Sequence, residues 1–201
     1  MDYRIRKSTN GQRRLSINEE NEKVIELVCM YANNEQGFVD SGFNHDKGLL
    51  LGGRTGSGKT ELLKTYKDFI KLELGKPIAF HSCQDVYDRF VDIDPMTMKI
   101  RGYFGIKDFC ALNSPSEKIF DDLGIEETSV QDYGNKTALM PYVFGKRYDN
   151  KFTCGKTHAT TNLSKQSLID KYGSRFESRL HETFNFIGLG TNNNSIDHRK
   201  S

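Results

Sequence analysis

The segment from Gly53 to Thr60 constrains this chain more than any other feature of its sequence. It reads Gly-Arg-Thr-Gly-Ser-Gly-Lys-Thr, which fits the pattern Gly-x-x-x-x-Gly-Lys-Thr of a phosphate-binding loop. Glycines let the backbone turn sharply and bring its N–H groups close to a phosphate without interference from a Cβ atom. A helix that begins near Lys59 would direct the positive end of its dipole at the same phosphate. The pattern predicts a nucleotide site, with a coincidental glycine turn as the alternative.

Two side chains of this loop have defined roles in such a site. We expect Lys59 to neutralise the β- and γ-phosphates of ATP and the Thr60 hydroxyl to bind Mg²⁺. The expected nucleotide-binding residues are Gly53, Arg54, Thr55, Gly56, Ser57, Gly58, Lys59, Thr60 and Glu61.

The flanks of the loop agree with this prediction. The apolar run 48–52 predicts a buried strand before the loop, and apolar residues at helical spacing over 62–74 predict a helix after it. Gly75 and Pro77 stand where that helix should end. A strand, a glycine-rich loop and a helix in this order are the context that the phosphate-binding mechanism requires.

The rest of the chain alternates between short apolar runs and amphipathic segments. A capping-box sequence at 16–19 predicts a helix to about Asn33. Further strands are expected at 78–80, 119–122, 157–161 and 186–189, further helices from Val86, over 136–148 and over 165–184, and irregular chain over 92–115. Pro141 would kink or delay the helix in which it lies. This alternation predicts an α/β domain around a mostly parallel sheet.

Polar residues follow two of the predicted strands. Asp121 and Asp122 end one of them, where one carboxylate can hold Mg²⁺ and its neighbour can polarise a water molecule for attack on the γ-phosphate. Asn162 ends another and could orient that water or touch the γ-phosphate. The alternatives are an acidic turn for the two aspartates and a helix N-cap for Asn162, with Ser164 competing for the cap.

Composition limits the other classes of protein that the chain could belong to. It has 201 residues, 28% of them charged and 36% hydrophobic, which suits one globular domain with or without a short appendage. The longest apolar stretch, 24–32, is too short to span a membrane, and the N-terminus lacks the apolar core of a signal peptide. Four widely spaced cysteines fit reduced thiols. A cytoplasmic protein is expected.

Two segments are candidates for contact with nucleic acid. Residues 1–14 hold five basic side chains, which can lie along phosphates or form a solvated tail. Residues 101–105 read Arg-Gly-Tyr-Phe-Gly and combine a cation with aromatic rings that can stack on single-stranded bases. The alternative for Tyr103 and Phe104 is a place in the core beneath a loop.

Three segments together resemble the AAA+ ATPases grouped with the DnaC and DnaI helicase loaders and the transposition helper IstB. Residues 121–126, 160–164 and 172–180 resemble, in this order, the Walker B, sensor 1 and arginine-finger regions, and 195–199 resembles the ending after the last strand. The resemblance covers about residues 45–200. Residues 45–201 are therefore expected to form the ATPase core, and residues 1–44 an N-terminal basic arm with a helical segment.

The resemblance implies a three-layer P-loop NTPase fold of the AAA+ type. It implies a mostly parallel five-stranded sheet in the order 5-1-4-3-2, with the C-terminal lid absent or vestigial. It also implies roles for six residues: Asp121 at Mg²⁺, Asp122 at the attacking water, Asn162 at sensor 1, Arg179 or its neighbour Arg175 as an arginine finger, and Arg199 near sensor 2.

Two features qualify these implied roles. Asp122 stands where the family usually has a glutamate, so slow or partner-stimulated turnover is expected. Arg175 and Arg179 lie four residues apart, which also fits a solvated helix face.

Four functions remain open at this point. The first is an ATP-hydrolysing replication accessory protein that loads a helicase, with a replicative helicase and single-stranded DNA as partners and head-to-tail self-assembly in the ATP-bound state. The second is an IstB-like helper with a transposase as partner. A small-molecule kinase and a nucleotide-gated binding module without turnover are the others. No membrane contact is expected.

Overall fold

A parallel five-stranded sheet forms the centre of the molecule in a computed structural model. The structure describes residue 17 and residues 21–93, 100–103, 114–126, 130–132, 135–150, 153 and 155–189. The strands of the sheet are β1 (Gly48–Gly53), β2 (Ala79–Ser82), β5 (Lys118–Leu123), β8 (Thr157–Thr161) and β9 (Phe184–Leu189). They lie side by side in the order β2-β5-β8-β1-β9. Numbered along the chain and read from β9, this is the predicted order 5-1-4-3-2, which is confirmed.

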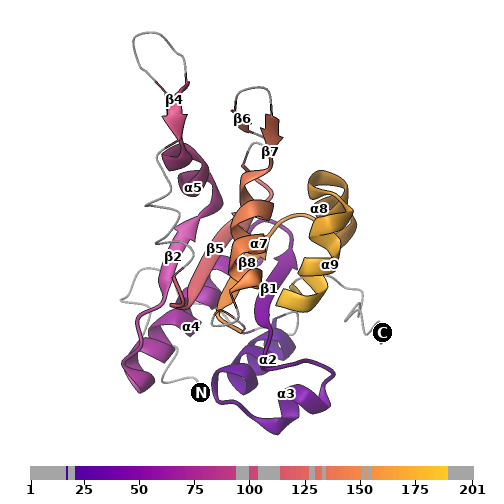
Figure 1. Ribbon diagram of the computed structural model, residues 1–201. Coiled ribbons are helices and arrows are strands. Elements are labelled where there is room, and N and C mark those ends of the chain that lie inside the picture. Colours follow the sequence, from indigo (N-terminus) through magenta and orange to yellow (C-terminus); the bar gives the residue numbers. More distant parts are fainter. Residues whose placement is uncertain are drawn as a thin grey trace.

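Helices cover both faces of this sheet (Figure 1). On one face α2 (Glu22–Ala32), α3 (Gln36–Asp40) and α4 (Lys59–Leu74) pack against Leu49, Leu51 and Ile187. On the other, α5 (Cys83–Phe90), α7 (Leu139–Asp149), α8 (Lys165–Tyr172) and α9 (Ser174–Thr183) supply the apolar side chains around Leu50, Phe120 and Ala159. Buried residues alternate between the two faces because side chains alternate along a strand. The predicted three-layer α/β fold is confirmed.

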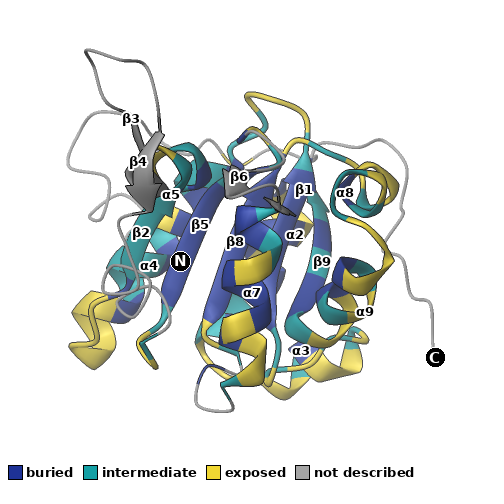
Figure 2. Cartoon of the chain, turned by 45° about the horizontal axis from the view of Figure 1, so that its top comes forward, coloured by how far each residue is buried: buried dark blue, intermediate teal, exposed yellow. Residues whose placement is uncertain are grey.

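Burial follows this layered arrangement (Figure 2). The three inner strands β5, β8 and β1 are buried almost throughout, as expected for strands covered on both faces. The last residues of α4, including Leu72 and Leu74, are exposed. No helix in the described ranges is both long and apolar enough to cross a bilayer. Cys29 and Cys83 are free thiols.

Several element boundaries differ from those predicted. The helix predicted over 165–184 is two helices, because Gly173, with φ 89° and ψ 168°, ends α8 and precedes α9. The helix predicted from 136 begins at Leu139, which places Pro141 in its first turn, where no N–H is needed. Before it, β6 (Val130–Asp132) and β7 (Asn135–Thr137) pair antiparallel. The helix α2 begins at Glu22, and most of the predicted capping box lies outside the described residues.

The segment predicted to be irregular, 92–115, contains part of a β-hairpin. Strands β3 (Val91–Ile93) and β4 (Ile100–Tyr103) pair antiparallel directly after α5. Figure 1 places β4 at the end of the molecule toward which strand β1 points. The prediction was wrong for these residues, since runs of three and four residues are too short for apolar alternation to mark a strand.

Candidate nucleotide-binding site

The predicted phosphate-binding loop connects β1 to α4, as the sequence pattern requires. Gly58 has φ 93° directly before α4, a left-handed conformation that glycine adopts without strain. Gly53 lies against β9, and a Cβ atom there would come within 2.2 Å of the carbonyl oxygen of Leu189. The two glycines that define the motif are thus required by the backbone itself. The first turn of α4 points its N–H groups and dipole toward the loop.

Lys59 is buried beneath this loop, with 4% of its surface exposed. Its ammonium group donates to the carbonyl oxygens of Gly53 at 2.9 Å and Arg54 at 2.8 Å, and to Asn162 Oδ1 at 2.9 Å. Burial lowers the pKa of Lys59, while the nearby charges of Asp122 and Asp121 act in the opposite direction. The cation is held at the loop, in position to meet a phosphate.

The two aspartates lie in a local irregularity of strand β5. The sequence predicted that the strand ends at these acids, but it continues to Leu123. Its register against β8 shifts between Phe120 and Leu123. Asp122 has φ 57°, a left-handed conformation that is uncommon outside glycine. The consequence is that the carboxylates of adjacent residues, which a regular strand would direct to opposite faces, both lie near the loop.

Asp121 is joined to the loop by a direct hydrogen bond. The Thr60 hydroxyl donates to Asp121 Oδ1 at 2.9 Å, as does the Thr160 hydroxyl at 2.6 Å. A hydroxyl and a carboxylate oxygen this close are hard ligands that fit the coordination shell of Mg²⁺, which keeps most of its water and takes one or two protein oxygens. Thr60 and Asp121 are the residues that would hold the ion, and this role stays a prediction. No group of three or more His, Cys, Asp or Glu side chains suited to a metal occurs in the described part of the chain.

Asn162 connects the cation of the site to its second acid. Its Oδ1 accepts a hydrogen bond from Lys59, and its amide nitrogen donates to Asp122 Oδ1 at 3.3 Å. Burial raises the pKa of Asp122, the charge of Asp121 raises it further, and Lys59 and Asn162 oppose this. A carboxylate with a raised pKa is a stronger base. Sequence reasoning also offered Asn162 as a helix cap, but Ser164 caps α8 by accepting from the Ser167 N–H at 3.0 Å.

Arg179 and Arg175 lie on α9, apart from this group. The Arg179 guanidinium forms an ion pair with Asp149 at 3.5 Å and lies over the ring of Tyr148, both at the end of α7. A Cβ atom on Gly145 would come within 2.1 Å of Arg179 Nη1, so this glycine leaves the space that the guanidinium fills. Arg175 is exposed. Arg199, the predicted sensor 2 residue, lies outside the described residues.

Two residues of this region were not assigned roles from the sequence. Thr160 contacts both aspartates and is fully buried. Glu126 is also buried and accepts hydrogen bonds from the Gly124 N–H and the Tyr172 hydroxyl. The signal for Thr160 was present in the sequence: a hydroxyl in a buried strand must find partners.

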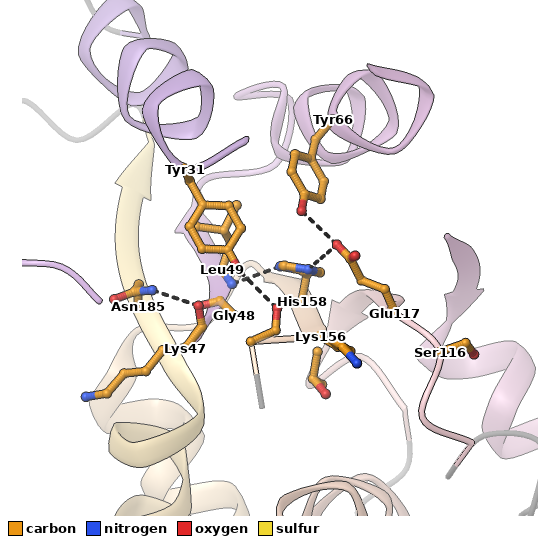
Figure 3. Close-up of polar contacts among 12 residues, drawn as sticks. Tyr31, Lys47, Gly48, Leu49, Tyr66, Ser116, Glu117, Lys156, His158 and Asn185 are labelled. Carbon is orange, nitrogen blue, oxygen red and sulfur yellow. Dashed lines mark hydrogen bonds and ion pairs between the residues drawn. The ribbon is translucent and has the colours of Figure 1, made fainter. Parts of the chain in front are cut away.

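A second polar cluster lies at the opposite edge of the sheet (Figure 3). His158 Nδ1 accepts the Leu49 N–H at 3.0 Å, which places the ring proton on Nε2, 2.8 Å from Glu117 Oε1. The Tyr66 hydroxyl donates to the same carboxylate oxygen at 2.7 Å, and the Tyr31 hydroxyl donates to the Gly155 carbonyl at 2.9 Å. The cluster joins α2, α4 and three strands where the strands begin. It is internally satisfied and serves the fold.

Comparisons with known proteins find solved structures of replication proteins that share this fold. No family model and no curated sequence matches the chain. A crystal structure of the DnaC helicase loader is similar with a TM-score of 0.64 and 22% identity, over 94% of this chain and 99% of that one. A primosome component from Streptococcus pyogenes serotype M3 gives 0.58 and 19%, over 88% and 83%. AMPPCP-bound DnaA from Aquifex aeolicus gives 0.60 and 16%, over 88% of this chain and 48% of that one. At these identities the likeness establishes the fold alone. At the level of the fold it confirms the predicted resemblance, because the chain has the AAA+ type of P-loop fold that the DnaC, DnaI and DnaA structures share.

Proposed function

We propose that this chain binds ATP with Mg²⁺ and hydrolyses it as a replication accessory protein of the helicase-loader kind. One observation carries the proposal: Lys59, Asn162 and Asp122 form a continuous hydrogen-bonded chain, and Thr60 and Asp121 are joined directly beside it. These five side chains come from three separate segments, and the fold brings them to one edge of the sheet.

Each of these groups would have one task. The loop amides and Lys59 would bind the β- and γ-phosphates, whose oxygens would compete with the Gly53 and Arg54 carbonyls for the ammonium protons. Mg²⁺ held by Thr60 and Asp121 would offset the charge on the phosphate oxygens. Asp122, held by Asn162, would accept the proton of the attacking water.

The likeness to helicase loaders supports the choice of partner. The similar structures include proteins whose names are DnaC helicase loader and primosome component, and a DnaA bound to AMPPCP and single-stranded DNA. We propose a replicative helicase and single-stranded DNA as the partners of this chain, and head-to-tail self-assembly with ATP at the interface. An IstB-like role with a transposase has the same site and differs in its partner. The Asp121–Asn162–Arg179 set argues against a small-molecule kinase, which would need an arginine-rich lid.

The test separates binding from hydrolysis. Lys59→Ala removes the charge that faces the phosphates, so ATP affinity should fall by about tenfold or more, or hydrolysis should collapse, while the fold survives. Asp122→Asn keeps the shape and removes the base, so ATP should still bind and hydrolysis should fall by about 10²-fold or more. Binding is followed with a fluorescent ATP analogue and hydrolysis by phosphate release, with and without single-stranded DNA.

Two outcomes would contradict the proposal. If folded Lys59→Ala protein binds and hydrolyses ATP like the parent, the phosphate-binding assignment is wrong. If the parent binds ATP but releases no phosphate under any of these conditions, the chain is a nucleotide-gated binding module.

A further inference from the structure

Strand β5 has a β-bulge at Asp121 and Asp122, where it contains one more residue than the neighbouring strand β8. Phe120 pairs with Ala159 and Leu123 pairs with Thr161, so Asp121 and Asp122 together face the single residue Thr160. A residue inserted in this way loses its regular partner in the ladder and needs another. The left-handed φ of Asp122 marks the point at which the backbone departs from the strand.

The Thr160 hydroxyl supplies what the ladder lacks. Its oxygen accepts the Asp122 N–H at 2.9 Å, and its proton is donated to Asp121 Oδ1 at 2.6 Å. The side chain is fully buried, so water does not replace either bond. One hydroxyl thus fixes the backbone of one acid and the carboxylate of the other.

This arrangement determines which way the acids face. Asp121 Oδ1 also accepts a hydrogen bond from the Thr60 hydroxyl. Two hydroxyls, one from β8 and one from the first turn of α4, thus hold the same carboxylate oxygen. With its N–H fixed to β8, Asp122 turns its carboxylate to Asn162 and toward the charge of Lys59.

We propose that Thr160 is a positioning residue of the hydrolysis site, which acts through Asp121 and Asp122 and does not touch the substrate. The inference rests on the proposed function for its catalytic consequence, though not for its geometry. A role in packing alone would not need the hydroxyl: valine has nearly the same shape, suits a buried parallel strand, and has no polar atom to satisfy. The hydroxyl makes two bonds to the acids that valine could not make.

Adjacent residues provide matched variants. Thr160→Val removes the hydroxyl and keeps the shape, and Thr160→Ser keeps the hydroxyl. Thr161→Val is the control, because Thr161 is equally buried and its hydroxyl also makes two bonds, to the Leu123 carbonyl at 2.7 Å and from the Leu163 N–H at 3.1 Å, but it contacts neither acid.

The first measurement is hydrogen exchange at the Asp122 amide, followed by NMR in each full-length variant. Thr160→Val should speed this exchange by about tenfold relative to the parent, while Thr160→Ser and Thr161→Val change it by less than about threefold. The second is steady-state ATP hydrolysis with ATP affinity. Thr160→Val should lower kcat by about tenfold or more with Kd for ATP within about threefold, and Thr160→Ser should restore kcat.

The two measurements separate the possible failures. Unchanged exchange at Asp122 in folded Thr160→Val protein would overturn the positioning role, whatever the activity. Faster exchange with parental kcat, or an equal fall of kcat in Thr161→Val, would overturn its catalytic consequence. A parent that hydrolyses no ATP sinks the proposed function instead, and the exchange measurement still decides whether Thr160 positions the acids.

Discussion

At the scale of single residues, the site contains an uncommon backbone conformation at Asp122. Asp122 is one of two residues other than glycine with a positive φ in the described part of the chain. Such a conformation costs about 1–3 kcal/mol and persists only where the surroundings enforce it. Thr160 and Asn162 supply that enforcement through the backbone and the side chain of Asp122. The cost is consistent with a site whose geometry is selected for chemistry.

A residue-scale prediction concerns Glu117, at the other edge of the sheet. Burial raises the pKa of its carboxyl, but the hydrogen bonds from His158 and Tyr66 and the charges of His158 and Lys76 outweigh this, so the pKa lies below its ordinary value. Stability from this group is therefore present above the unfolded pKa of about 4.5 and is lost as pH falls through the lower, folded value.

The prediction is checked by urea unfolding between pH 7 and about pH 3. Glu117→Gln should be less stable than the parent at pH 7, and the difference should shrink as the pH falls below about 4.5, because the parent alone loses the ionised form. A difference that stays constant over this range would show that the Glu117 charge contributes nothing.

At the scale of elements, the sequence predicted strands and helices well where a hydrophobic pattern is repeated. It predicted them poorly where the conformation of one residue sets the boundary. The strand before the phosphate-binding loop and the strand 157–161 were predicted closely, because each is a short apolar or β-branched run beside a clear turn. The bulge in β5 was not, since it depends on contacts with Thr160 across the sheet. Likewise, the break at Gly173 depends on a backbone conformation that helical periodicity does not reveal.

An element-scale prediction concerns the contact between α7 and α9. Glycine inside a helix costs about 1 kcal/mol relative to alanine, so Gly145 is expensive unless its space is used. The Arg179 guanidinium occupies that space. Gly145→Ala should displace the guanidinium, so the helix gain of about 1 kcal/mol should be largely offset in the parent. In an Arg179→Ala background the same change should stabilise by about 0.5–1 kcal/mol. Urea unfolding of the parent, the two single variants and the double variant measures this coupling. If Gly145→Ala changes the free energy of unfolding equally in both backgrounds, the Arg179 guanidinium does not lie against Gly145 in solution.

At the scale of the whole molecule, the two polar clusters lie at opposite edges of one sheet and differ in how their groups are paired. The cluster around His158 ties the helices of one face to the starts of the strands, and its donors and acceptors are paired with one another. The cluster at the loop pairs Lys59 with carbonyls and with Asn162, partners that a phosphate can replace. Binding of the proposed nucleotide would therefore change contacts at one edge of the sheet and leave the pairs at the other edge as they are.

The last prediction concerns assembly and tests whether Arg179 acts on a neighbouring subunit. A trans-acting arginine stabilises charge on the γ-phosphate and can raise turnover by about 10³–10⁵-fold. In the single subunit Arg179 is paired with Asp149, a bond on the surface worth at most about 1 kcal/mol, so a neighbour's phosphate could draw it away.

Mixing Arg179→Ala subunits, which keep their loop, with Lys59→Ala subunits, which keep their arginine, should restore ATP hydrolysis that neither variant shows alone. Arg175→Ala is mixed in the same way, because Arg175 is exposed one turn earlier on α9. Recovery with Arg175→Ala alone would move the role to Arg175, and no recovery with either, in mixtures shown by light scattering to co-assemble, would mean that hydrolysis is completed within one subunit.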